Sequence, residues 1–364
     1  MKHIPILLLG SLLFCLYSPS VRGYTENSDA SVDIKKSDRS ISIQFDNDSF
    51  VEWLPGVQYA PGYIHDTDRN FSNGFRIDLQ LNPNFGLFKS LVPGIPNQYS
   101  GFLVGQEIYT PEDITEDEVL FDQRPYAGYL FIEYYEAYYQ DNKYLRYGIQ
   151  TGCIGPCALA GETQNKIHQG KRDASNEDTP PNANGWDHQI GNEMVLQTNL
   201  KLQWVSLVEA EYFDVSPYVI GNFGNVFTDI GLGFSSRLGV FNKNPVLEET
   251  GAYLIFNIMR KRVFYNATIQ GGWFNRTFDN NNKSDHTFVE VNRYVWNMDL
   301  LLSITPVDCF TFNAGLGFVG SEIDIKNMES DNSEKEQKDF NLQSGGNSLQ
   351  EDQYFVRIQA KYNF

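Results

Sequence analysis

Carboxylates, amides and hydroxyls recur, mostly at alternate positions, in two stretches near the N-terminus, residues 41–50 and 68–81. Such groups are common in acid–base and ligand-binding sites. Apolar residues occupy the intervening positions, which predicts two strands with one apolar and one polar face each. A closed apolar core would have to pair every polar group, so the pattern indicates either a half-solvated sheet or a membrane barrel with a polar lumen. The polar faces carry Ser42, Gln44, Asp46, Asp48, Ser72, Arg76, Asp78 and Gln80.

Histidine is the side chain best suited to moving protons near neutral pH. His168 falls in the last turn of a short helix predicted over residues 158–171, after the break at Gly155 and Pro156. By position alone, it is as readily a surface residue as a general base. The sequence has no G-x-S-x-G, H-E-x-x-H or P-loop motif, so familiar motifs assign no chemistry. The histidines after residue 23 are His65, His168, His188 and His286.

The alternation of apolar and polar residues recurs along the chain and defines twelve strand candidates. Long connections at one end of the predicted meander alternate with short turns at the other, although residues 83–98 and 222–224 fit this rule poorly. Such an arrangement is typical of bacterial outer-membrane barrels. The sequence therefore predicts an all-β, twelve-stranded antiparallel up-and-down transmembrane β-barrel with a short helix in one extracellular loop. The candidates are residues 40–51, 73–82, 99–110, 127–138, 142–154, 190–205, 207–221, 225–239, 251–265, 288–304, 308–322 and 353–364.

The C-terminal stretch supports this fold. From Tyr354 to Phe364, apolar or aromatic residues alternate with mostly polar ones, and the chain ends on an aromatic residue. This ending resembles the assembly signature of outer-membrane barrels. The 26 Phe and 21 Tyr residues would supply the aromatic girdles at the two membrane interfaces.

The N-terminus and the overall charge limit the localisation and the partners. Residues 1–23 have a basic start, a short apolar run and then a region of small residues suited to cleavage, which predicts a secretory signal peptide. Residues 24–39 form a polar leader, and residues 40–364 form the predicted barrel. The net charge of -18 and the lack of a basic run argue against a nucleic acid partner. No obligate protein partner is predicted, and an acidic chain that meets an anionic lipid would require bridging divalent cations.

Three cysteines follow the signal peptide: Cys153, Cys157 and Cys309. Cys153 and Cys157 could pair across the intervening turn in an oxidising compartment. The alternative is that all three remain inert thiols.

Seven segments, in this order, resemble the motifs of the LpxR-type lipid A 3′-O-deacylases of Gram-negative outer membranes. They run from the first predicted strand to the sixth, and their shared order makes the resemblance specific. The segments are FDNDSF (45–50), TDRNFSNG (67–74), QEIYTP (106–111), RPYAG (124–128), IGP (154–156), QNKIH (164–168) and GWDHQIGNE (185–193).

The resemblance implies a hydrolase that removes the 3′-linked acyloxyacyl chain from lipid A of lipopolysaccharide with the help of Ca²⁺. It implies a site in the barrel wall near the outer leaflet, in an integral outer-membrane protein whose long loops are extracellular and whose neighbours are membrane lipids. Metal ligands fall on Asn47 and Asp48, and the catalytic residues on His168, Ser72 and Asn47. Calcium prefers carboxylate, amide and backbone oxygens and polarises an ester carbonyl. His168 would take a proton from water that Ser72 holds.

One departure from the family pattern affects the site. The family has a glutamate six residues after the histidine, and Ala174 stands there in this chain. Asp173, Glu177 or Glu162 could substitute, and the sequence does not choose among them.

Two other functions stay open. A different outer-membrane phospholipase or acyltransferase would use Ser72 as nucleophile and His168 as base. A non-enzymatic channel or adhesin would also account for a polar lumen and long loops, although side chains leave a twelve-stranded barrel little open bore.

Overall fold

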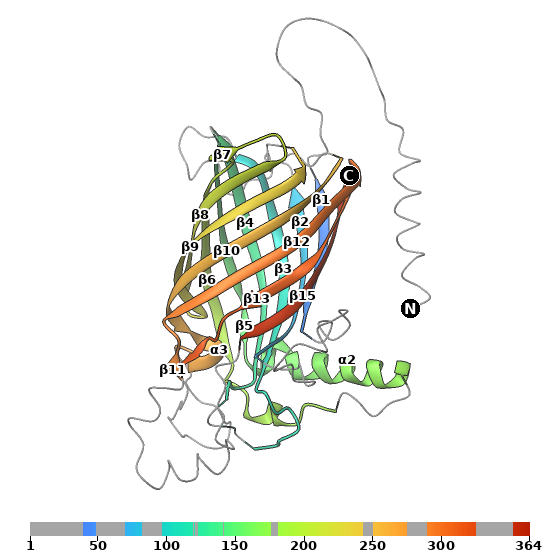
Figure 1. Cartoon of the computed structure of the whole chain (residues 1–364). Helices are drawn as coiled ribbons and strands as arrows, with labels where there is room; N and C mark the ends of the chain where they lie inside the picture. The colour runs from blue at the N-terminus through green and yellow to red at the C-terminus, as the bar shows by residue number, and fades with distance from the viewer. Residues whose placement is uncertain are drawn as a thin grey trace, which may run out of the picture.

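The computed structural model describes residues 39–48, 70–81, 97–118, 120, 123–140, 142–175, 181–242, 250–274, 290–324 and 352–364. Twelve long strands in these ranges form one closed antiparallel barrel (Figure 1). β1 pairs with the C-terminal β15, and β6 pairs with β8 to complete the ring. The strands are β1 Ser40–Asn47, β2 Asn70–Leu81, β3 Asn97–Thr110, β4 Ala127–Gln140, β5 Lys143–Ile154, β6 Glu193–Trp204, β8 Phe213–Gly224, β9 Phe227–Val240, β10 Gly251–Asn266, β12 Tyr294–Val307, β13 Phe310–Val319 and β15 Gln353–Asn363.

All twelve predicted strands are present, and the predicted barrel is confirmed. Most predicted strand ends differ from the observed ones by a few residues, and two of the predicted boundaries were wrong by more. The strand predicted over residues 207–221 is divided into a short β7, Val208–Glu209, and β8. The strand predicted to begin at residue 288 begins at Tyr294, because β11, Glu290–Val291, pairs with β14, Ile323–Asp324, outside the barrel sheet. The predicted signal peptide and most of the leader lie outside the described residues.

Short helices gather at the end of the barrel that carries the long connections (Figure 1). The predicted helix over residues 158–171 is confirmed as α2, Ala160–Ser175, preceded by the 3-10 turn η4, Pro156–Ala158. The helix continues past Gly170, so His168 does not lie in its last turn as predicted. Two further segments at this end are η5, Gly185–His188, and α3, Ala267–Gln270.

A disulfide between Cys153 and Cys157 joins the end of β5 to η4, so the structure has the pairing that the sequence left open and not two inert thiols. The disulfide therefore spans the turn that leads into α2. No helix in the described part of the chain is long and apolar enough to cross a membrane.

The outward face of the wall is apolar because every second residue of each strand points away from the lumen. Large apolar side chains on this face stay exposed in the isolated chain, as expected where lipid replaces water. They include Ile41, Ile43, Phe75, Ile77, Leu232, Phe234, Leu254, Phe256, Leu300 and Leu302.

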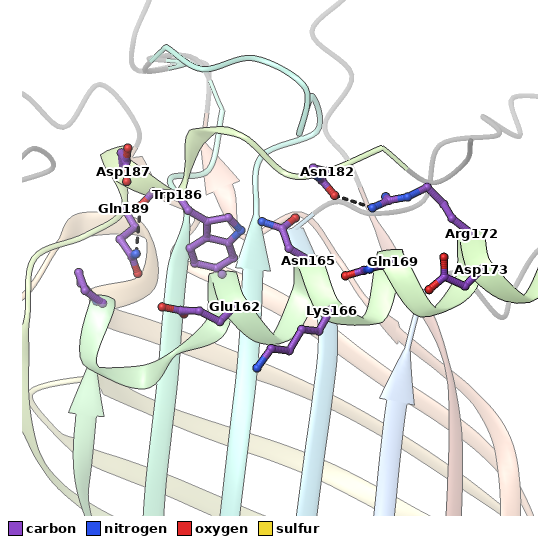
Figure 2. A pocket seen from close by; sticks show the side chains of 12 residues that line it. Glu162, Asn165, Lys166, Gln169, Arg172, Asp173, Asn182, Trp186, Asp187 and Gln189 are labelled. Carbon is purple, nitrogen blue, oxygen red and sulfur yellow. Dashed lines mark hydrogen bonds between the residues drawn. The ribbon is translucent and has the colours of Figure 1, made fainter. Parts of the chain in front are cut away.

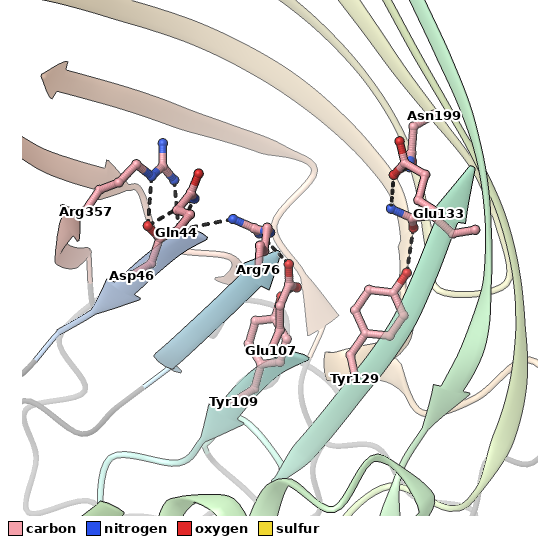
Figure 3. A network of polar contacts seen from close by, with 10 residues as sticks. Gln44, Asp46, Arg76, Glu107, Tyr109, Tyr129, Glu133, Asn199 and Arg357 are labelled. Atoms are coloured by element: carbon pink, nitrogen blue, oxygen red, sulfur yellow. Dashed lines mark hydrogen bonds and ion pairs between the residues drawn. The ribbon is translucent and has the colours of Figure 1, made fainter. Parts of the chain in front are cut away.

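The inward face is polar and filled by paired charges (Figure 3). The Asp46 carboxylate lies between Arg76, at 3.2 Å, and Arg357, at 2.9 Å. Arg76 also contacts Glu107 at 2.6 Å, and the Tyr109 hydroxyl donates to the same carboxylate at 2.6 Å. These pairs satisfy buried charges that an apolar core could not accept. The polar strand faces are therefore explained mainly by the lumen.

Candidate functional site

A β-bulge at Ser72 brings together two of the residues that the sequence analysis placed in the site. In the β2–β3 pairing, Phe71 is opposite Tyr109 and Asn73 is opposite Ile108, so Ser72 is the extra residue. Bulges of this kind redirect side chains and are frequent beside active sites. The Asn47 side-chain amide donates to the Ser72 carbonyl oxygen at 3.0 Å, which ties β1 to the bulge.

The Ser72 hydroxyl is 2.7 Å from the hydroxyl of Thr110 at the end of β3. Both residues are buried. Asn47, Ser72 and Thr110 thus form a polar line across β1, β2 and β3, which we call the wall cluster. The sequence analysis missed Thr110, although it lies in the YTP part of a quoted motif.

One side-chain oxygen of the wall cluster lacks a hydrogen-bond donor among the described residues. Asn47 is only 4% exposed, and no described residue donates a hydrogen bond to its Oδ1 atom. Asp48, the next residue, is buried as well. The orphaned amide oxygen fits the oxygen preference of a hard cation such as Ca²⁺, and Asp48 adds a carboxylate next to Asn47 in the chain.

Carboxylate and histidine ligands alone do not form a metal centre here. Among the described residues, no group of three or more His, Cys, Asp or Glu side chains could hold a metal ion. A cation at Asn47 and Asp48 would therefore need backbone oxygens or water to complete its shell.

α2 contacts β3 and β4 at their loop ends. Asn47 has the parity of the outward-facing Ile41 and Ile43, and Thr110 has the parity of Val104. Gln106, of that same parity on β3, donates to the Ala158 carbonyl oxygen at 2.7 Å. Gln106 also donates to the Thr163 hydroxyl at 3.2 Å, so the first turn of α2 lies on the outer face of the wall, as Asn47 and Thr110 do by parity.

His168 lies on the face of α2 that is turned toward the protein. It is 1% exposed, like Ala160 two turns earlier. Ala160 abuts Gly128 of β4, where any side chain would collide with it. From Ala160 to His168 the helix advances about 12 Å, which spans two to three strands at a spacing of about 4.8 Å. In Figure 2, α2 runs across the ends of the strands, and its main contacts with the barrel are with β3 and β4.

A contact with a backbone carbonyl determines the tautomer of the neutral His168 ring. The Nδ1 atom is 2.6 Å from the carbonyl oxygen of Pro181, which can only accept a hydrogen bond. The neutral ring must then carry its proton on Nδ1, so Nε2 is the nitrogen able to accept a proton. Pro181 therefore has the orienting role that a carboxylate has in many catalytic histidine pairs.

The quoted GWDHQIGNE motif holds α2 in place. The Trp186 indole donates to Gln164 at 2.9 Å, and its ring lies against Gly161, where a side chain would not fit. Asn165 exchanges two hydrogen bonds with the backbone of Ala183, at 2.9 and 3.2 Å. Trp186 also packs with Ile108 of β3 and with Tyr126, so these contacts fix the helix against the end of the barrel.

The carboxylates considered as replacements for the missing glutamate lie elsewhere. Glu162 and Asp173 line a polar groove between α2 and the segment around Trp186 (Figure 2). Both are exposed, whereas His168 is buried on another face of the helix. The structure thus does not support either as the orienting partner of His168. The third candidate, Glu177, lies outside the described residues.

The quoted RPYAG motif has a structural role that the sequence did not reveal. Arg124 is buried and contacts Glu322 at 2.8 Å, and it also donates to the Thr268 hydroxyl. Burial raises the pKa of Glu322, but Arg124 and Lys261 outweigh burial and lower this pKa to about 2. These contacts join three segments that are far apart in the chain, around Arg124, Thr268 and Glu322, at the loop end of the barrel.

Comparison with known proteins agrees with this architecture. The family model described as outer membrane protein LpxR matches residues 7–299. The solved structure titled "LpxR from Salmonella typhimurium" aligns over 89% of this chain and 100% of its own, with a TM-score of 0.65 and 18% identity. A NanC porin aligns over 90% of this chain and 100% of its own, but its TM-score of 0.35 and 6% identity support no argument. No curated protein matches the sequence.

Proposed function

Because the chain belongs to the LpxR family of outer membrane proteins, we propose that it is a lipid A deacylase that hydrolyses the 3′-linked acyloxyacyl ester. The position of the wall cluster carries this proposal. Asn47 and Thr110 are polar, yet they have the outward parity of strand residues that face lipid, and the bulge at Ser72 brings its hydroxyl to Thr110. A channel would place such groups in the lumen. A lipid hydrolase needs them where an ester can arrive from the membrane.

The roles of the residues follow from their contacts. His168, with its proton held on Nδ1 by Pro181, takes a proton from the attacking water at Nε2. Ser72, fixed by the bulge and by Thr110, holds that water or the substrate oxygen. Asn47 positions Ser72 through its amide and keeps its Oδ1 atom for a cation.

Calcium is the cofactor that best fits the wall cluster. Asn47 and Asp48 would hold it, with backbone oxygens or water as further ligands. When bound, it supplies positive charge that stabilises the oxyanion of the ester. The chain carries a net charge of -18, so a cation would also favour contact with a phosphorylated lipid.

The same assignment fixes the orientation of the barrel. Outer-membrane barrels have short periplasmic turns and longer extracellular loops. The end that carries α2 then lies at the outer leaflet, where lipopolysaccharide is found. His168 and the wall cluster would thus meet the acyl chains of the substrate near the membrane interface.

The decisive experiment is the mass spectrum of lipid A from cells that express the wild-type chain, the His168→Ala variant or neither. We expect loss of the 3′-linked acyloxyacyl mass only with the wild type. An unchanged spectrum with the wild-type protein folded and present in the membrane would contradict the proposal, as would equal deacylation by the variant.

The serine-nucleophile alternative has weaker support. Within the described residues, the Ser72 hydroxyl has its hydrogen bond with Thr110 and not with a histidine. A nucleophilic serine normally has its base within hydrogen-bonding reach. Covalent labelling of Ser72 by a serine-directed reagent would nevertheless favour this alternative over direct attack by water.

A further inference from the structure

The outward face of β10 changes from apolar to basic toward the loop end of the barrel. Leu254 and Phe256 are exposed apolar residues, as expected next to lipid. Further along the same face, Arg260 and Arg262 are exposed as well. Lys261 between them has the opposite parity and contacts Glu322 at 3.5 Å. The two arginines are therefore part of the outer surface and not of the polar lumen.

Aromatic rings surround both guanidinium groups. The Arg260 guanidinium is 5.0 Å from the Tyr294 ring centroid and 5.4 Å from that of Trp296. The Arg262 guanidinium is 5.2 Å from Phe264 and 5.9 Å from Tyr294. Register pairs Arg260 with Trp296 and Arg262 with Tyr294, so neighbouring strands β10 and β12 build this arrangement together. We call these five residues the arginine patch.

The arginine patch has no negative partner in the described part of the chain. Neither guanidinium forms an ion pair with a carboxylate there. On the β9 side, their register neighbours Leu232 and Ile230 are exposed and apolar. Within the ranges that the structure describes, the two positive charges therefore border the lipid-facing surface without a paired carboxylate. This is unusual in a chain with 46 acidic and 28 basic residues.

We propose that the arginine patch binds a phosphate group of lipopolysaccharide. The patch lies at the same end of the barrel as α2, where β10 and β12 meet α3 and β11 (Figure 1). With the orientation proposed above, this end meets the phosphorylated headgroups of the outer leaflet. Arginine binds phosphate through parallel hydrogen bonds, and the aromatic rings hold the guanidinium planes toward the interface.

This lipid site is separate from the proposed catalytic site. In the order of the sheet, β1, β15 and β13 lie between β2 and β12, so the patch is on another part of the wall from Ser72. A lipopolysaccharide molecule bound there would be retained and not hydrolysed. The inference depends on the proposed orientation but not on the deacylase activity.

The test uses the full-length protein in detergent with His168→Ala, which prevents turnover, and with EDTA, which removes bridging cations. Binding of lipopolysaccharide, chemically dephosphorylated lipopolysaccharide and phosphatidylglycerol is measured by native mass spectrometry. Arg260→Gln/Arg262→Gln is compared with Lys143→Gln, which removes an exposed charge near the short-turn end. Heat-modifiability on gels shows whether each variant is folded, and Arg260→Lys/Arg262→Lys keeps the charge without the paired geometry.

We expect the Gln pair to weaken lipopolysaccharide binding by about tenfold or more, since it removes charge-assisted hydrogen bonds. Lys143→Gln should bind like the parent, and the dephosphorylated lipid should bind the parent as weakly as intact lipid binds the Gln pair. The Lys pair should bind more weakly than Lys143→Gln, which tests the patch even if the Gln pair fails to fold. Equal binding by the patch variants and Lys143→Gln would overturn the site. Equally tight, patch-dependent binding of phosphatidylglycerol would overturn its assignment to lipopolysaccharide.

Discussion

Replacing Thr110 by Val should lower deacylation because Thr110 holds the Ser72 hydroxyl. The two hydroxyl oxygens are 2.7 Å apart and both residues are buried, so the variant leaves a buried hydroxyl without its partner. That loss costs about 1–3 kcal/mol. If this loss raises mainly the free energy of the transition state, kcat falls about 5- to 150-fold, since each step of about 1.4 kcal/mol changes the rate by a factor of about ten. We expect KM to change less, as measured by release of the acyloxyacyl product from lipid A in detergent.

Two controls separate positioning from general damage. Thr110→Ser keeps the hydroxyl and should retain most of the activity, and both variants should remain heat-modifiable barrels. In a Ser72→Ala background, Thr110→Val should have little further effect, because residues that act through one another are not additive. Equal activity of the Val and Ser variants, or an undiminished effect of Thr110→Val without Ser72, would refute the reasoning.

Four other outcomes can be measured on the same protein. His168→Ala should leave the barrel folded and lower ester hydrolysis by about two to four orders of magnitude, as for loss of a general base; near-normal activity would remove it from the mechanism. EGTA should abolish activity, calcium should restore it better than magnesium, and Asp48→Ala should mimic chelation more severely than Asp48→Asn; full activity in excess chelator would exclude the metal. The pKa of Glu322 is lowered from 4.5 to about 2, so its contribution of up to about 3 kcal/mol should be present above pH 4.5 and be lost as the pH falls toward 2; Glu322→Gln should lack this acid dependence in gel-monitored unfolding. Deleting Phe364 should impair assembly, measured as loss of the heat-modifiable band, and normal membrane yield would count against the C-terminal signature.

The barrel was predictable because a wall between lipid and a polar lumen requires a period of two in every strand. The prediction was least accurate where the wall ends. Residues 290–291 continue the apolar alternation, but they lie beyond the last β10–β12 pair, Arg262–Tyr294, and pair with β14 instead. The helix around His168 was also found from its sequence, but its end was not. Gly170 lies in open space and stays helical, so it does not terminate α2.

The wall cluster was only partly predictable. Alternation implies that Ser72 shares the inward parity of Asp78, and only the pairing of Phe71 and Asn73 with β3 reveals the bulge that redirects it. Thr110 enters the site through that same register. Contacts made by backbone atoms, such as that of Pro181 with His168, have no residue signature. The resemblance to a family supplied the candidate residues, whereas the geometry identified their hydrogen-bond partners.

The candidate site combines residues on barrel strands, Asn47 and Ser72, with His168 on a helix that lies in a loop. Asn47 and Ser72 belong to strands that are hydrogen-bonded on both sides, so their positions follow from the barrel itself. His168 belongs to α2, which is fixed by the Trp186 and Asn165 contacts and begins beside the Cys153–Cys157 bridge, and its ring is held by the Pro181 carbonyl. Errors of about 1 Å in such a base can cost a hundredfold in rate. Catalysis should therefore be lost through changes at the α2 contacts well before the barrel loses stability, which accounts for a family motif at residues 185–193 that supplies none of the proposed catalytic groups.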